Sequence, residues 1–352
     1  MRPILRVDTS IVVNNWKTLN RLVGSTVSCV PVVKANAYGL GVEQVSLALT
    51  KAGVASFFVA DATEGSELRK IVGGAPEIYI LGGYIEFYSK NYAQDILVPL
   101  LNSSESAIKF LRDFPHLDYG VQIETGLNRL GLSASELDRL HTKLTPRPPK
   151  LIISHLACAD DPKANMNTRQ LLKTIEIAST LPRTPNTKVS IAGSDALLID
   201  DRFHMDMVRP GVSLYCGGFL PKLQDPISIT ARAIKSQIIQ RGETVGYGAT
   251  WTASKPTRIT TLSAGYADGI PRNFNGDLSF FADGVSCPTV GRISMDLVTI
   301  DTTHLDDVPT HFELIGDHQT LKEFANSIGE IPNSLLTSFG ACMRHHYTTE
   351  TS

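Results

Sequence analysis

The chain has 352 residues, of which 42% are hydrophobic and 19% are charged, enough for two globular domains with their own cores. Its 33 basic and 35 acidic side chains nearly cancel, leaving a formal net charge of -2. This balance argues against a nucleic-acid partner and against binding to an anionic membrane. We therefore expect a function on a small molecule.

Neither targeting nor metal binding is indicated by the sequence. The N-terminus reads MRPILRVDTS and lacks the apolar run of a signal peptide, and no other stretch is long enough to span a membrane. A cytoplasmic location is the resulting expectation. The cysteines are odd in number and have no CxxC spacing, so we predict no disulfide framework and no metal site. They are Cys29, Cys158, Cys216, Cys287 and Cys342.

Residues 1–226 alternate between short apolar runs and segments with helical character. Helices are expected over Thr9–Val23, over 42–53, and over 133–143, where Ser133 and Glu136 form a capping box. Eight runs in this length predict a (β/α)8 barrel over residues 1–226. An open doubly wound sheet is the alternative, although no G-x-G-x-x-G follows the first run. The runs are 29–33, 56–60, 77–81, 95–100, 119–123, 150–155, 188–192 and 207–215.

The pattern changes near Pro226. The runs that follow are short, several alternate, and turn pairs such as Arg241-Gly242 and Asp283-Gly284 separate them. We predict a second, mostly β domain over residues 227–352. Its expected strands are 227–231, 258–262, 278–281, 285–290 and 297–300.

Reactive side chains follow several of the barrel runs. In such barrels the chemistry takes place where strands end and loops begin. Lys34 follows the first run, and a lysine in a partly apolar site loses proton affinity and can form a Schiff base. Arg129 follows the fifth run, where it could bind a carboxylate, and His155 ends the sixth. Each of these side chains could equally be an ordinary surface or structural residue.

Small residues lie after the seventh barrel run and within the eighth. Gly193 and Ser194 come after the seventh, and Arg209, Gly211 and Val212 lie in the eighth. Backbone N–H groups at these places commonly bind a phosphate group in such barrels. A lysine, two arginines, a histidine and a phosphate cradle on one rim together suit a phosphorylated carbonyl cofactor.

The chain resembles the alanine racemases, which are fold-type III pyridoxal-phosphate enzymes. Six motifs occur in the family's order, and the resemblance covers essentially the whole chain. They are VKANAYG at 33–39, TGLNRLG at 125–131, SHLA at 154–157, RPG at 209–211, AGYADG at 264–269 and GRISMD at 291–296.

The resemblance implies roles for single residues. Lys34 is similar to the lysine that carries pyridoxal 5'-phosphate as a Schiff base and acts as one catalytic base. Tyr266 is similar to the opposite base, supplied by the second subunit of a homodimer. Arg209 is similar to the arginine that faces the pyridine nitrogen, and His155 to the histidine that links it to the tyrosine. The implied phosphate contacts are Tyr38, Ser194, Gly211, Val212 and Tyr347, the substrate contacts Arg129 and Met295, and the entrance residues Asp160 and Arg292.

The implied reaction is the interconversion of L-alanine and D-alanine, which supplies D-alanine for peptidoglycan. The cofactor acidifies the substrate Cα–H, and racemisation removes a proton on one face and returns one on the other. We expect a cationic network through His155 and Arg209 to stabilise the charged form of the Tyr266 phenol. An arginine at the ring nitrogen keeps its own proton, so the ring nitrogen stays unprotonated and side reactions are limited.

Three positions depart from the usual family pattern, and two other activities remain open. Gly193 replaces a common asparagine, Ser294 a common cysteine, and Gln122 a lysine that is often carbamylated. A glutamine cannot be carbamylated, so we expect Arg129 to be oriented differently here. The alternatives are a racemase of another small amino acid, such as serine, and a fold-type III decarboxylase. The motif at 264–269 and the chain length favour the racemase.

Overall fold

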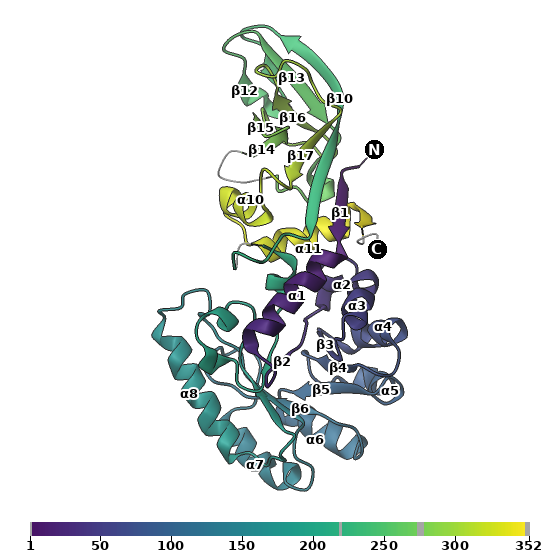
Figure 1. Ribbon diagram of the computed structural model, residues 1–352, viewed down its shortest axis with the longest axis vertical. Helices are drawn as coiled ribbons and strands as arrows, with labels where there is room; N and C mark the ends of the chain where they lie inside the picture. Colours follow the sequence, from purple (N-terminus) through teal and green to yellow (C-terminus); the bar gives the residue numbers. More distant parts are fainter. Residues whose placement is uncertain (1, 218–219, 273–277, 349–352) are drawn as a thin grey trace. The chain divides into compact units, whose positions relative to one another are not determined.

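The computed structural model describes residues 2–217, 220–272 and 278–348. These residues fall into two compact units. Residues 13–37 and 42–214 form the first, which we call the barrel unit. The other described residues form the second, which we call the β unit (Figure 1).

The barrel unit contains eight parallel strands that close on themselves. Six form one sheet in the order β3-β4-β5-β6-β7-β8, and β2 pairs with β9. The Val33 N–H donates to the Phe58 carbonyl at 2.8 Å and joins β2 to β3, while the Arg209 N–H donates to the Ala192 carbonyl at 2.9 Å and joins β9 to β8. The predicted barrel is confirmed. Its strands are β2 Ser28–Cys29, β3 Ser56–Val59, β4 Glu77–Ile80, β5 Leu97–Leu101, β6 Gly120–Gln122, β7 Leu151–Ile153, β8 Lys188–Ser190 and β9 Met207–Val208.

Helices cover the outside of these strands (Figure 1). The predicted capping box is present: the Glu136 N–H bonds the Ser133 hydroxyl, and the Glu136 carboxylate bonds the Ser133 N–H. The α-helices before and within this unit are α1 Thr9–Val23, α3 Val42–Lys51, α4 Ala62–Val72, α5 Ser89–Gln94, α6 Ser104–Asp113, α7 Ala134–Leu144, α8 Asn165–Thr180 and α9 Val212–Tyr215. The segment labelled α2, Lys34–Tyr38, is a left-handed turn. The described residues contain no helix that is both long and apolar enough to cross a membrane.

The last apolar run, 207–215, differs from its prediction as one strand. Only Met207–Val208 is extended in a ladder, and Val212–Tyr215 is a short helix. Pro210 has no N–H to donate to a ladder, so pairing ends at its carbonyl, which accepts the Val32 N–H at 2.9 Å. This break turns the chain at the rim and directs backbone N–H groups toward Ser194.

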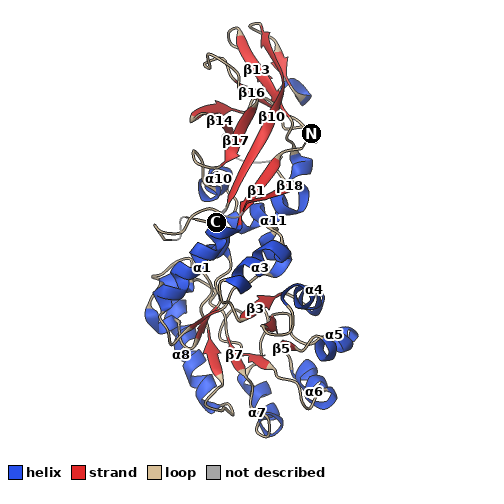
Figure 2. Ribbon diagram, turned by 45° about the vertical axis from the view of Figure 1, so that its right-hand side comes forward, coloured by secondary structure: helices blue, strands red, loops and turns tan. Residues whose placement is uncertain are grey.

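The β unit is built around one long strand, β10 Ile227–Ile239 (Figure 2). It pairs antiparallel with β1, β13 and β17. Strand β1, Ile4–Asp8, was not among the predicted strands, and it also pairs in parallel with β18. In the β14–β15 hairpin, Asp283 and Gly284 have φ of 47° and 85°, as a two-residue turn of the I′ type requires.

A mostly β second unit is therefore confirmed. Near its C-terminal end the unit also contains two helices, α10 Leu321–Ile328 and α11 Pro332–Cys342, which the alternating pattern did not predict. Its other elements are β11 Thr244–Val245, β12 Trp251–Thr252, β13 Thr257–Leu262, β14 Ser279–Ala282, β15 Val285–Pro288, β16 Val298–Asp301, β17 His311–Ile315 and β18 Arg344–Thr348.

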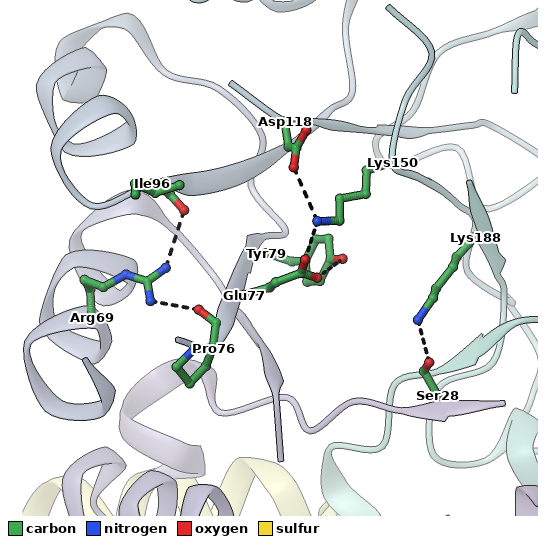
Figure 3. A network of polar contacts seen from close by, with 9 residues as sticks. All are labelled: Ser28, Arg69, Pro76, Glu77, Tyr79, Ile96, Asp118, Lys150 and Lys188. Carbon is green, nitrogen blue, oxygen red and sulfur yellow. Dashed lines mark hydrogen bonds and ion pairs between the residues drawn. The ribbon is translucent and has the colours of Figure 1, made fainter. Parts of the chain in front are cut away.

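A polar network joins the amino ends of the barrel strands (Figure 3). The Lys150 ammonium bonds the Glu77 carboxylate and lies 3.3 Å from the Asp118 carboxylate. The Tyr79 hydroxyl donates to Glu77 at 2.8 Å, and Lys188 donates to the Ser28 hydroxyl at 2.6 Å. Burial alone would raise the pKa of Glu77, but the bonds from Lys150 and Tyr79 outweigh it and lower the pKa. The Lys150 contacts join β4, β6 and β7, and the Lys188–Ser28 bond joins β8 to β2, at the end of the barrel that serves stability.

We predict that Glu77→Gln destabilises the protein by about 1 kcal/mol at pH 7, because it removes the ion pair with Lys150. The loss is no larger because the Glu77 and Lys150 side chains are 37% and 34% exposed, and water weakens their attraction. A lowered folded-state pKa contributes stability above the ordinary glutamate pKa of about 4.3, and that stability is lost as the pH falls. Urea unfolding of both proteins at several pH values measures the difference, which should shrink below about pH 4. Glu105→Gln, in the exposed pair with Lys109, is the control and should cost less. A loss that does not depend on pH would contradict the assignment.

Candidate active site

Lys34 begins a left-handed turn at the carboxyl end of β2. Ala35, Asn36, Ala37 and Tyr38 have φ between 52° and 57°. This conformation is uncommon for residues with a Cβ and costs roughly 1–2 kcal/mol for each. The Asn36 side chain accepts a hydrogen bond from the Val42 N–H at 2.8 Å and helps to hold the turn. Consecutive strained residues are a feature of functional sites.

The Lys34 amine lies in an environment that weakens its hold on a proton. Burial lowers the pKa of Lys34, and the nearby Arg129 guanidinium lowers it further. Glu64 acts in the opposite direction. A lysine with a lowered pKa has more free amine at neutral pH, which both nucleophilic attack and proton transfer require.

Arg209 is a buried cation at the end of β9, only 5% exposed. Nη1 donates to the Ser190 hydroxyl at 2.5 Å, and Nη2 donates to the Ser154 carbonyl at 2.7 Å. His155 Nδ1 lies 3.4 Å from Nη2. Burial lowers the pKa of Arg209 to about 10, which leaves it charged at neutral pH. Among the described residues no carboxylate forms an ion pair with it, so its charge is held by neutral groups alone.

Ser194 forms the centre of a small cradle after β8. Its hydroxyl oxygen accepts hydrogen bonds from the Gly211 N–H at 2.9 Å, the Ser213 N–H at 3.1 Å and the Ser213 hydroxyl at 3.0 Å. Three donors directed at one oxygen are the arrangement that binds a phosphate oxygen. The structure therefore brings Ser194 and Gly211 together as predicted, with Val212 next in the chain, and adds Ser213, which the sequence did not single out.

His155 follows β7 and faces Arg209. The residue is exposed at the rim, and protein atoms surround the rest of its imidazole. Burial lowers the pKa of His155 to about 3, and Arg209, Arg129 and Lys34 contribute to this shift. The imidazole is therefore neutral at pH 7. The expected cationic network through His155 and Arg209 is reduced to Arg209 alone.

Arg129 lies in an exposed loop after β6 that is held by its neighbours. The Glu124 carboxylate accepts the Gly126 N–H and, at 2.9 Å, the Asn128 N–H. Gln122 is buried, and its amide donates to the Leu130 carbonyl at 3.1 Å. Gln122 thus holds the loop through the backbone next to Arg129, which gives a physical role to this departure from the family pattern.

Gln170 on α8 is a fully buried residue that sequence reasoning missed. Its amide donates to the His155 carbonyl at 3.0 Å and to the Thr125 hydroxyl at 3.2 Å, and it accepts the Ala157 N–H at 2.8 Å. One side chain therefore fixes the loops that carry Arg129 and His155. The sequence does hold one sign of this role. Gln170 lies on the buried face of α8, and a buried polar side chain needs hydrogen-bond partners.

Gly193 lies against the His155 ring. A Cβ at residue 193 would come 3.1 Å from His155 Cε1, which is tight enough to move the ring. Both residues line a cavity of about 190 Å³, together with Ser194 and the exposed Asp160. The second departure from the family pattern therefore leaves space beside the histidine that a larger side chain would fill.

In the β unit, Tyr266 and Met295 are held together by their backbones. The Tyr266 N–H donates to the Ser294 carbonyl at 3.1 Å, and the Ala267 N–H donates to the Met295 carbonyl at 2.9 Å. A Cβ on Gly265 would clash with the Met295 backbone, so this close approach requires glycine. The Tyr266 side chain is 38% exposed and the Met295 side chain 54%. Arg292, close by in sequence, is also exposed.

Two further predicted residues, Tyr38 and Tyr347, belong to the β unit. Burial raises the pKa of Tyr38 to about 12, so its phenol stays protonated and can act as a donor. The Tyr347 hydroxyl lies 3.1 Å from His345 Nδ1. No cluster of three or more potential metal ligands occurs among the described residues.

The chain matches two family models and many known proteins. Residues 7–218 match the alanine racemase N-terminal domain, and residues 227–347 match the alanine racemase C-terminal domain. Alanine racemases of Cereibacter sphaeroides and Dinoroseobacter shibae are 35% and 36% identical to the chain, each over 97% of both sequences.

Solved structures agree with these matches. The alanine racemase of Bartonella henselae with covalently bound pyridoxal phosphate superimposes with a TM-score of 0.93 at 33% identity, covering 99% of this chain and 100% of the other. The biosynthetic alanine racemase of Pseudomonas aeruginosa gives 0.91 at 30% identity over the same shares.

The barrel with its lysine-bearing rim and the mostly β unit, matched over nearly their full length, define an enzyme of the amino-acid racemase class. Within that class, the chain belongs to the alanine racemase family.

We predict that the His155 imidazole does not titrate between pH 5 and pH 8 in the protein without added ligand. Its pKa of about 3 keeps it neutral over this range. Side-chain ¹⁵N NMR of labelled histidine measures this directly, and the spectrum of His155→Gln assigns the signal. A His155 titration midpoint within that range would contradict the assigned neutral state.

Proposed function

We propose that the protein racemises alanine with pyridoxal 5'-phosphate as its cofactor, using Lys34 and Tyr266 as two bases. The observation that supports this most strongly is the buried Arg209, whose charge has no carboxylate partner among the described residues. A buried cation without a counter-charge is costly unless an electron-rich group completes its surroundings. A pyridine nitrogen is such a group.

The donors of the barrel unit fit this cofactor. Lys34 would hold it covalently, Arg209 would donate to its ring nitrogen, and Ser194 with the N–H groups of Gly211 and Val212 would bind its phosphate. We propose that Tyr38 and Tyr347 add phenol donors to that phosphate. The Gly211 N–H and the Ser213 hydroxyl now donate to the Ser194 hydroxyl oxygen at 2.9 Å and 3.0 Å, and a phosphate oxygen would replace it as their acceptor.

The cofactor, when bound, withdraws electrons and acidifies the substrate Cα–H. The residues of this chain bind the substrate and move its proton. Arg129 and the Met295 N–H would bind the substrate carboxylate. The Lys34 amine would exchange a proton on one face of Cα, and the Tyr266 phenol would exchange one on the other. His155 would link Arg209 to that phenol as a neutral donor and acceptor rather than as a cation.

We further propose that the enzyme is a homodimer in which each site receives Tyr266 and Met295 from the second subunit. The segment that carries Met295, and the turn at Tyr247 that packs against residues 291 and 292, expose large apolar side chains, as expected of a surface that a partner covers. Exposed fractions are 68% for Tyr247, 54% for Met295 and 40% for Leu297. If this surface is the dimer interface, Lys34 of one subunit and Tyr266 of the other would approach the substrate from different subunits.

The proposed cellular role is to supply D-alanine for peptidoglycan from the cytoplasm. A small amino-acid substrate, with no nucleic-acid or membrane partner, agrees with the near-neutral charge balance of the chain. The biosynthetic alanine racemase of Pseudomonas aeruginosa, a structural relative, is consistent with this role.

The test is to incubate the cofactor-loaded protein with L-alanine in heavy water. We expect deuterium at Cα in the D-alanine product, because the proton taken by one base is not the proton returned by the other. NMR and chiral chromatography measure exchange and racemisation together, and serine and other small amino acids run in parallel define the substrate range. No exchange and no D-alanine, with cofactor bound, would reject the proposal.

Two variants separate the parts of this proposal. Lys34→Ala should lose both the visible absorption of the bound cofactor and the turnover. Tyr266→Phe should keep the absorption and affect exchange from L-alanine and from D-alanine unequally, because each enantiomer presents its proton to a different base. Equal and mild effects on both enantiomers would remove Tyr266 from the mechanism.

A further inference from the structure

A carboxylate that the sequence did not single out lies beside Lys34. Glu64 is in the first turn of α4, immediately after β3, and is half-buried. One carboxylate oxygen accepts the Ala35 N–H at 2.7 Å, and the other accepts the Ala60 N–H at 2.7 Å. Ala35 follows Lys34, and Ala60 follows β3. A single side chain therefore bridges the carboxyl ends of two neighbouring barrel strands.

The first of these bonds falls on the strained turn. Ala35 is the first of the four consecutive left-handed residues, with φ of 52°. Because that conformation costs free energy at each residue, the turn needs fixed partners outside itself. Hydrogen bonds from backbone N–H groups to a carboxylate are charge-assisted and stronger than those to a neutral acceptor. Glu64 is thus placed to keep the backbone of Lys34 in one position.

The charge of Glu64 also acts on the Lys34 amine. Arg129 and His155 are the other titratable groups from neighbouring loops that interact with it, and Arg129 lowers the pKa of Lys34, as burial does. Glu64 raises it. Without this carboxylate the amine would be surrounded by a cation and a neutral imidazole, and it would hold a proton less well. A base that must both take and return a proton needs the balance.

We propose that Glu64 is a positioning residue that holds the strained turn carrying Lys34 and balances the charge around its amine. This inference rests on the proposed function, in which Lys34 is the reactive lysine. The carboxylate serves two purposes with one geometry, since the bond to Ala35 fixes both the backbone and the place of the charge.

The test uses the apoprotein and the variant Glu64→Gln, which keeps the size of the side chain and removes its charge. The rate at which Lys34 reacts with acetic anhydride is followed against pH by mass spectrometry of its peptide. Losing the charge lowers the pKa of Lys34, so the midpoint of the profile should move to lower pH. The rate on the rising limb should increase by about twofold or more. Hydrogen exchange at the Ala35 and Ala60 amides should become faster.

Glu67→Gln, an exposed glutamate three residues along α4, is the matched control and should change neither reading. Glu64→Asp keeps the charge, so the midpoint of its Lys34 acetylation profile should stay closer to wild type, even where amide hydrogen exchange is faster. If the glutamine variant does not fold, a Lys34 midpoint in Glu64→Asp that differs from that of Glu67→Gln would overturn the charge role. An unchanged or higher midpoint in Glu64→Gln, or exchange equal to that of Glu67→Gln, would overturn the proposal.

These readings do not depend on turnover. If wild-type Lys34 forms no adduct with pyridoxal phosphate, the proposed function fails. If the adduct forms but the Glu64→Gln profile matches wild type, only the role of Glu64 fails.

Discussion

The buried charge of Arg209 is the constraint on which the rest of the site depends. A guanidinium that is 5% exposed needs partners for its N–H groups, and neutral oxygens from three places accept from its Nη1 and Nη2 atoms: the Ser190 hydroxyl and the carbonyls of Ser154 and Ile191. These partners come from β8 and from the residues that follow β7 and β8. The charge therefore fixes the relative positions of the loops that carry His155 and Ser194. Burial lowers the pKa of His155, and the Arg209 charge adds to that shift.

The charged side chains at the two ends of the barrel have different kinds of partner. At the amino ends of the strands, Lys150 is paired with Glu77 and Asp118, so the charges there largely cancel. At the carboxyl ends, Lys34, Arg129 and Arg209 form no ion pair among the described residues. The nearby carboxylates of Glu64 and Glu124 accept backbone N–H groups instead. One end is arranged for stability, and the other keeps cations that have no ion-pair partner among the described residues.

Much of this arrangement could be predicted from sequence, because apolar runs and caps are local signals. The barrel strands, the capping box at Ser133 and the rim positions of Lys34 and His155 all follow from such signals. Strand β1 could not be predicted as part of the β unit, since its pairing with β10 joins residues more than 200 positions apart. The 207–215 run is apolar throughout and so predicts one strand, while Pro210 ends the ladder inside it.

Gln170 and Glu64 were not predicted as site residues for one shared reason. Gln170 and Glu64 act through hydrogen bonds to the backbone of distant loops, and such partners leave no mark on the local pattern. Likewise, the charge state of His155 depends on burial and on Arg209, neither of which spacing reveals. Gln122 and Gly193 were recognised as departures, but their consequences, a bond to the Leu130 carbonyl and space beside His155, needed the structure.

We propose that Arg209 is a permanent donor to the ring nitrogen of the cofactor. The most direct measurement is the ¹⁵N chemical shift of ring-labelled pyridoxal phosphate bound to the protein, with Arg209→Glu as the comparison. The account predicts the shift of an unprotonated ring nitrogen in the wild type and a protonated one in the variant. A protonated ring nitrogen in the wild type would contradict it.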